Sequence, residues 1–177
     1  MSLRVAFWAF VALACVGFCL VFFWAGPMVK ADGVVIFDMR TAGYSLAEAQ
    51  AILAQLSDDA RAAYLGPERL ADTIFPIGIC GTLALGIILG ARVWSLPLAL
   101  GLALVPLGYF IFDMLENAGV ARMLLAGPEG IEAEGVARVS QYTQWKFRLV
   151  NLSLGLIVVI WGARGVLAQY ARKTRQT

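Results

Sequence analysis

Residues 96–117 read LPLALGLALVPLGYFIFDMLEN, and this stretch decides the fold class. Residues 96–112 carry no charged side chain, and then Asp113 and Glu116 follow within one helical turn. A helix needs roughly 20 mostly apolar residues to cross the hydrocarbon of a membrane. The stretch therefore predicts a membrane-spanning helix, which we place at about 96–115, with a polar group at one end.

Three further stretches have the same apolar character, at about residues 5–24, 72–91 and 145–163. Hydrophobic residues make up 60% of the chain and charged residues 15%, against about 45–50% and about 25% in soluble domains. We therefore predict an all-α membrane protein, a bundle of four transmembrane helices in a single domain of residues 1–177. The first stretch is longer than the apolar part of a signal peptide and lacks a typical cleavage site, so we interpret it as a retained anchor helix.

The distribution of positive charge predicts the orientation, because cytoplasmic loops of membrane proteins are enriched in lysine and arginine. The segments on one side of the four spans hold only cations and no acidic residue: Arg4, Arg92, Arg164, Arg172, Lys173 and Arg175. The segments on the other side hold the remaining cations and all of the acidic residues. We therefore place both termini in the cytoplasm, with loops 25–71 and 116–144 on the outer side.

The outer loop 25–71 is too long to lack structure in a compact protein. Ser45 and Glu48 have the spacing of a capping box, which predicts a short helix after Ser45. Ser57, followed by two acidic residues, predicts a second helix start. We expect the two short helices to form a small cap on the outer side, while the apolar run 34–37 fits either a strand or an interfacial anchor.

Local signals predict the ends and contacts of the spans. The helical pattern of the third span continues past the membrane surface to about residue 125, and Gly135 marks the lower bound for the start of the fourth helix. Pro106 predicts a kink in the third span. Gly86 and Gly90 form a small-residue pair in the second span, and this spacing favours close helix packing in lipid.

Polar side chains gather near the outer ends of the second, third and fourth spans, and an antiparallel bundle brings these ends to one level. Tyr109, Asp113 and Glu116 share one face of the third span. Lys146 and Arg148 lie about 200° apart on the fourth, so only one of them can face the acids. The candidate cluster comprises Asp72, Tyr109, Asp113, Glu116, Asn117, Lys146, Arg148 and Asn151.

Two hypotheses account for this cluster, because ionisable groups in hydrocarbon are costly unless they pair or meet water. In the first, the groups form an ion-pair network that fixes helix packing. In the second, they line a polar pocket for a lipid headgroup, a proton or a small substrate, where paired carboxylates can serve as acid and base. Helix geometry alone does not decide between them.

Three motifs also carry a family resemblance: residues 72–76 (DTIFP), residues 113–117 (DMLEN) and residues 146–147 (KF). Their order resembles that in a group of small bacterial four-helix integral membrane proteins. The resemblance implies that Lys146, rather than Arg148, is the cation that faces the acids. It also implies a location in a bacterial inner (cytoplasmic) membrane, and it implies no activity.

The chain contains no histidine, and its three cysteines lie in apolar stretches. No nucleophile elbow, phosphate loop or metal-ligand cluster is present. We therefore assign no catalytic residue, expect neither a metal nor a cofactor, and expect no nucleic-acid partner, while enzymatic activity stays open.

The favoured hypothesis is a small membrane protein that acts through association, as an accessory or scaffolding subunit of a membrane complex. Its expected partners are membrane lipids and either other membrane subunits or further copies of the chain. The alternative is an enzyme or binding protein for a lipid-like amphiphile that uses the polar cluster at the outer membrane face.

The predicted topology can be tested with reporter fusions. A reporter active only in the cytoplasm is expected to be active after Ser95 and at the C-terminus, and inactive near Ser57 and Glu129, because positive charge sets the orientation. Cytoplasmic activity of the Ser57 fusion would contradict the whole arrangement.

Overall fold

A computed structural model of the chain describes residues 2–30 and 36–174. These residues form helices and connecting turns, without a strand among them. Four helical segments are long and apolar enough to cross a membrane: Leu3–Val29, Asp58–Ala91, Leu96–Ala126 and Ala133–Lys173. The predicted all-helical class with four long apolar helices is therefore confirmed, and by length and composition these four candidate spans suggest a multi-pass membrane protein.

The first and second spans are composite helices. The first consists of α1 (Leu3–Cys19), a π-helical stretch η1 (Leu20–Ala25) and α2 (Gly26–Val29). In the second, α4 (Asp58–Ala63) runs through the π-helical η3 (Tyr64–Glu68) into α5 (Arg69–Ala91).

The third span consists of α6 (Leu96–Leu102) and α7 (Leu104–Ala126), and the fourth is α8 (Ala133–Lys173). The interruption at Ala103 is the one that Pro106 predicts, because a proline lacks the N–H that would bind the carbonyl four residues earlier. Helix α7 ends at Ala126, which confirms the predicted extension of the third helix to about residue 125, and α8 extends beyond the predicted fourth span at both ends.

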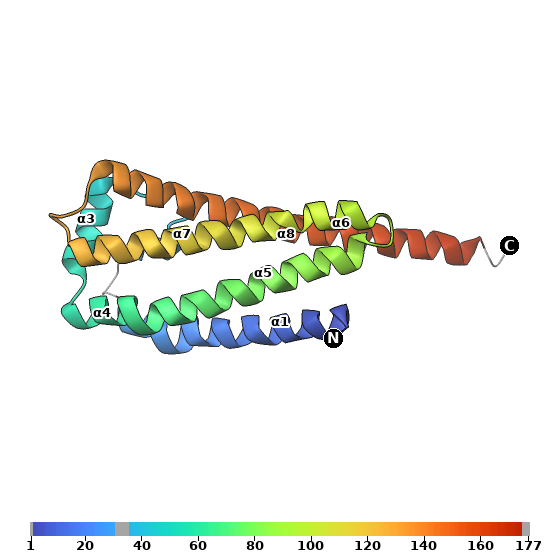
Figure 1. Cartoon of the computed structure of the whole chain (residues 1–177), viewed down its shortest axis with the longest axis horizontal. Helices are drawn as coiled ribbons and strands as arrows, with labels where there is room; N and C mark the ends of the chain where they lie inside the picture. The colour runs from blue at the N-terminus through green and yellow to red at the C-terminus, as the bar shows by residue number, and fades with distance from the viewer. Residues whose placement is uncertain (1, 31–35, 175–177) are drawn as a thin grey trace.

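The helices run side by side along the long axis of the molecule (Figure 1). Both described chain ends lie at the end that holds the turn between α5 and α6, which we call the turn end, and α3 (Leu46–Gln55) lies at the opposite cap end. Helix α1 packs along α5, and α7 packs along α8. Helix α5 joins the two pairs, because it also contacts α7 and α8.

Glycines allow α1 and α5 to approach until their backbones touch. A Cβ at Gly17 would lie 2.5 Å from the Cα of Phe75, and a Cβ at Gly78 would lie 2.4 Å from the backbone nitrogen of Ala14. Backbone atoms in a helix cannot move aside as a flexible side chain can. This contact therefore depends on both glycines.

The predicted small-residue pair lies where α5 packs on α8. A Cβ at Gly90 would lie 2.5 Å from Cγ2 of Ile160, and one at Gly86 would lie 3.2 Å from Cδ1 of Ile157. Both glycines therefore face a helix of their own chain.

The cap begins as the sequence predicts. The hydroxyl of Ser45 accepts a hydrogen bond from the backbone N–H of Glu48, whose side chain accepts from Ser45 in return, so the capping box opens α3. The hydroxyl of Ser57 caps α4 by accepting from the backbone N–H of Ala60. The carboxylate of Glu48 accepts from the backbone N–H and the hydroxyl of Ser45 and lies beside Arg40, so its pKa is lowered.

Apolar side chains fasten the cap to α7 and α8. Phe37, in the 3₁₀ turn η2 (Phe37–Met39), is fully buried together with side chains from α3, α7 and α8. Arg61 strengthens the contact, because its guanidinium donates to the carbonyls of Leu124 at 2.9 Å and Leu53 at 3.2 Å. The sequence left open whether residues 34–37 form a strand or an interfacial anchor. Of these four residues the structure describes only 36 and 37.

Two expectations about segment ends need correction. Helix α8 begins at Ala133 and not at Gly135, which is exposed in its first turn. The second cap helix is not separate, since α4 continues through η3 into α5. The wider π-helical turn accommodates Pro67 inside the helix, where an α-helix would lose a hydrogen bond and meet a steric clash.

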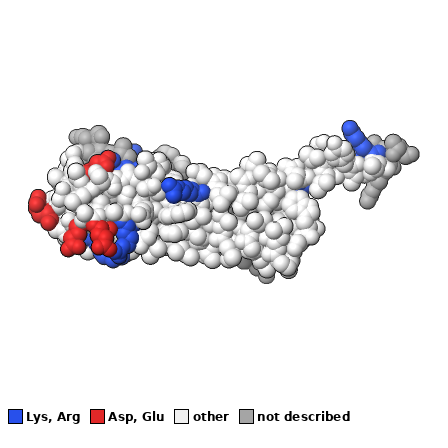
Figure 2. Space-filling view, turned by 90° about the horizontal axis from the view of Figure 1, so that it is seen from above, with Lys and Arg blue, Asp and Glu red and all other residues white. Residues whose placement is uncertain are grey.

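Charged side chains are distributed very unevenly over the surface. On the face in Figure 2, acidic atoms gather at the cap end beside basic ones, the projecting tail carries basic atoms, and most of the surface between the two ends is uncharged. This pattern agrees with a membrane-spanning middle, because a hydrocarbon-facing surface must be apolar.

Replacing Gly78 with alanine is expected to lower the thermostability of the purified protein in mild detergent. The added methyl group would collide with the backbone of α1, and such overpacking costs about 1–3 kcal/mol. Gly155→Ala is the matched control, because a Cβ at Gly155 meets nothing within 4 Å. Equal melting temperatures for the two variants would contradict the close α1–α5 contact.

Candidate functional site

A buried ion-pair cluster joins α7 and α8 near the cap end. The amino group of Lys146 lies 3.3 Å from Oδ1 of Asp113 and also pairs with Glu116. The side chains of Lys146, Asp113 and Glu116 are only 7%, 3% and 0% exposed. We call this group, with Asn117 and Thr143, the Lys146 cluster.

Helical spacing places these groups opposite one another. Asp113 and Glu116 lie three residues apart on α7, and Thr143 lies three residues before Lys146 on α8, so each pair shares a face. The hydroxyl of Thr143 donates to Oε1 of Glu116 over 2.5 Å. Tyr109 is buried one turn before Asp113 on the same face of α7.

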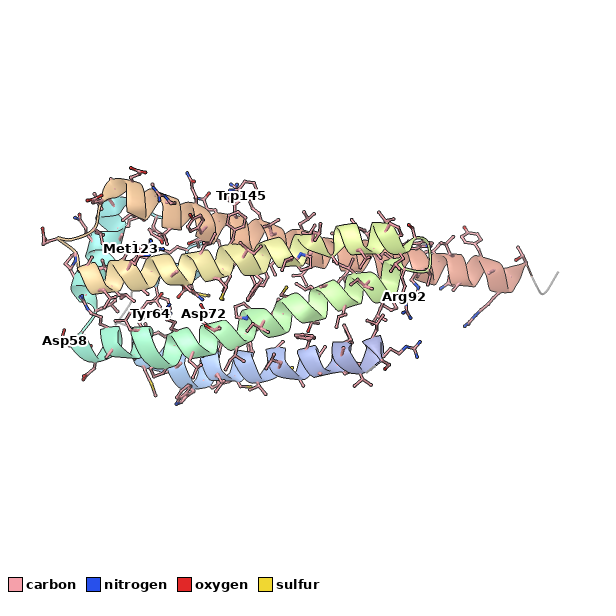
Figure 3. The ribbon with its side chains drawn as sticks, in the orientation of Figure 1. Asp58, Tyr64, Asp72, Arg92, Met123 and Trp145 are labelled. Atoms are coloured by element: carbon pink, nitrogen blue, oxygen red, sulfur yellow. The ribbon has the colours of Figure 1, made fainter. Side chains whose placement is uncertain are left out.

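Asn117 connects the cluster to α5. Its side-chain nitrogen donates to the backbone carbonyl of Asp72 at 3.2 Å and to Oδ2 of Asp113 at 3.4 Å. Asp72 and Tyr64 lie on the side of their helix that faces α7 (Figure 3). With Glu68 and Asn117 they line a cavity of about 10 Å³, which is room for roughly one water molecule.

Arg148 and Asn151 lie away from the cluster. Both are exposed, and the guanidinium of Arg148 lies 5.1 Å from the ring centroid of Trp145, which is on the outer surface of α8 (Figure 3). Lys146 is thus the inward-facing cation, as the motif resemblance implied and as helix-face arithmetic had left open. Of the eight candidate residues, the structure brings together Asp72, Tyr109, Asp113, Glu116, Asn117 and Lys146.

The cap covers the cluster from the cap end. The backbone N–H of Tyr44 donates to the hydroxyl of Ser140 at 2.8 Å, and Tyr44 is 7% exposed. Burial, together with the charge of Glu116, raises the pKa of the Tyr44 hydroxyl, so it stays neutral. Gly43, at a φ of +86°, brings this loop against Ser140 and Gln144.

A second polar contact holds the cap to the second span. The hydroxyl of Tyr64 donates to Oδ2 of Asp38 over 2.5 Å, which ties η2 to η3. Thr143, Tyr44, Ser140 and this Tyr64–Asp38 pair were not among the predicted residues. Thr143 could have been found, because it lies one helical turn from Lys146 on the same face.

Each carboxylate at the centre of the cluster has two partners. Asp113 contacts Lys146 and Asn117, while Glu116 contacts Lys146 and Thr143. Within the described residues, no group of three or more Asp, Glu, His or Cys side chains could hold a metal ion. These contacts can hold α5, α7 and α8 in a fixed alignment along the axis of the bundle.

Comparison with known proteins gives no further guide to the site. The chain matches no protein family, no curated protein and no solved structure.

Lys146→Gln is expected to lower thermostability in mild detergent more than Asp113→Asn does. Losing Lys146 leaves two buried carboxylates unpaired, whereas losing the charge of Asp113 leaves Lys146 with Glu116. Breaking a buried ion pair by removing one partner costs about 3–5 kcal/mol. The double variant should recover part of the sum of the single losses.

Arg148→Gln is the control, because it removes the same charge from the exposed side of α8. It should melt like the parent. The ion-pair account fails if Lys146→Gln also melts like the parent, or if Arg148→Gln is the more damaging of the two changes.

Proposed function

We propose that the protein acts through association, as an accessory or scaffolding subunit of a membrane complex. The observation that carries this proposal is the free end of α8. It projects beyond the other helices at the turn end, as Figure 1 shows. The proposal includes a bacterial inner membrane with both termini in the cytoplasm, because the cations without neighbouring acids lie at the turn end.

The last contacts of α8 with α5 are made by Trp161 and Arg164. The indole nitrogen of Trp161 donates to the carbonyl of Gly86 at 3.2 Å, and Arg164 donates to the carbonyl of Leu89 at 2.9 Å. Helix α8 then continues to Lys173, which adds about 13 Å at 1.5 Å per residue. All described side chains after Arg164 are exposed.

This projecting segment, residues 165–173, has two different faces. Val166, Leu167 and Tyr170 lie on one side at helical spacing and are 52%, 55% and 67% exposed. Arg172 lies on the opposite side, whereas Lys173 follows Val166 by seven residues and lies at the edge of the apolar side. An apolar stripe along one face of a helix is typical of a surface that packs against another element.

The direction of the segment favours a protein over the lipid surface as its partner. Helix α8 is unbroken from Ala133 to Lys173, so the projecting segment continues along the axis of the span. A helix that lies flat on a membrane would first have to bend away from that axis. A helix or groove of another subunit can cover the apolar face without such a bend.

The alternative, an amphiphile enzyme or binding protein acting at the Lys146 cluster, has less support. A lipid-like substrate would need access to Asp113 or Glu116, and both are buried and paired. Opening the cluster would leave charges unpaired in a poor solvent.

Site-specific cross-linking tests the association. A photoreactive residue at Leu167 is expected to form protein adducts in native membranes, while the same residue at Arg172, on the opposite side of the helix, should form few. Adduct masses distinguish a second copy of the chain from another protein. Absence of adducts at Leu167, together with purification only as a monomer, would contradict the proposal.

A further inference from the structure

We propose that the groove between the cap-end halves of α7 and α8 binds the phosphate group of an anionic glycerophospholipid from the surrounding membrane. The groove has a volume of about 280 Å³. Its lining shares no residue with the Lys146 cluster. This inference does not depend on the proposed association.

The floor of the groove is formed where the two helices touch. A Cβ at Gly119 would lie 2.3 Å from Cγ2 of Val139, so α7 and α8 are in close contact there. The walls above are formed by Arg122 and Met123 from α7 and by Arg138 from α8. The two guanidinium groups thus come from opposite walls.

The charge of the lining suits a phosphodiester. The lining residues carry two arginines and one acid, Glu132, a net charge of +1. Glu134, just outside the lining, pairs with Arg138, so the groove gains its positive charge when a ligand displaces Glu134. Arg122 donates through Nε to the carbonyl of Ala118 at 3.2 Å, and this contact engages one of the five N–H donors of a guanidinium. Guanidinium groups bind phosphate oxygens through paired hydrogen bonds.

Arg138 also pairs with Glu134 at 2.6 Å, but both side chains are well exposed. Exposed ion pairs are weak because water screens them and long side chains move freely. A phosphate held by two guanidinium groups in a groove can therefore compete for Arg138.

An apolar seam continues from the groove toward the middle of the bundle. Leu115 lines the groove, and Ile111 and Leu107 follow at helical spacing on the same face of α7. All three are exposed, at 39%, 49% and 44%. A lipid whose phosphate occupies the groove could therefore lay an acyl chain along this seam.

Aromatic rings beside the seam indicate where it lies relative to the membrane–water interface. The ring centroid of Phe112 lies 6.0 Å from that of Tyr142 and 6.1 Å from that of Trp145. Aromatic side chains of this kind concentrate at membrane–water interfaces. Arg122 lies seven residues beyond Leu115, or about 10 Å toward the cap, which is the direction of the headgroups.

Lipid-dependent thermostability tests the inference. Phosphatidylglycerol added to the protein in a neutral detergent is expected to raise the melting temperature more than phosphatidylcholine of the same acyl chains. The double variant Arg122→Gln with Arg138→Gln should lose this difference. Arg92→Gln with Arg172→Gln removes the same charge at the turn end and should keep it.

Three outcomes would overturn the inference. One is an equal rise with both lipids, and another is an undiminished difference in the groove variant. The third is an equal rise with glycerol 3-phosphate in solution, which would make the groove a site for soluble phosphates. Should the groove variant fail to fold, native mass spectrometry of the parent in an equal mixture of the two lipids decides, and only preferential retention of phosphatidylglycerol supports the site.

Discussion

The ion pairs of Lys146 with Asp113 and Glu116 constrain the rest of the bundle. Charged groups in apolar surroundings must be paired, and a pair that loses one member is far less stable than an intact one. This requirement sets the register of α7 against α8, because only one alignment brings the three side chains together. Asn117 links α5 to the same cluster through its hydrogen bond to the Asp72 carbonyl. One cluster therefore aligns three of the four spans.

The cap is part of the same arrangement. Its apolar core includes side chains from α7 and α8, and Tyr44 hydrogen-bonds to Ser140 directly above the cluster. Folding of the cap therefore removes water from the ion pairs, which strengthens them. The two surfaces that we propose for binding, the groove on α7 and α8 and the projecting segment of α8, lie outside this closed interior at opposite ends of the molecule.

Features that depend on local pattern could be predicted from the sequence. Apolar length identified the four spans, the Ser45–Glu48 spacing predicted α3, and 3.6-residue periodicity placed Asp113 and Glu116 on one face. The same periodicity could not choose between Lys146 and Arg148, since the choice depends on how α8 is rotated against α7. The contact of Tyr44 with Ser140 joins residues 96 positions apart, and no local signal reports such a contact.

Solvent access to Thr143 tests most directly whether the cluster is closed. The three native cysteines would be replaced by alanine, and Thr143→Cys would be compared with the exposed Gln141→Cys for reaction with a membrane-impermeant thiol reagent. A closed cluster predicts that Thr143→Cys reacts at least about tenfold more slowly, since the reagent must wait for local opening. Equal rates would mean that water fills the site, and would contradict a structural ion-pair cluster sealed by the cap.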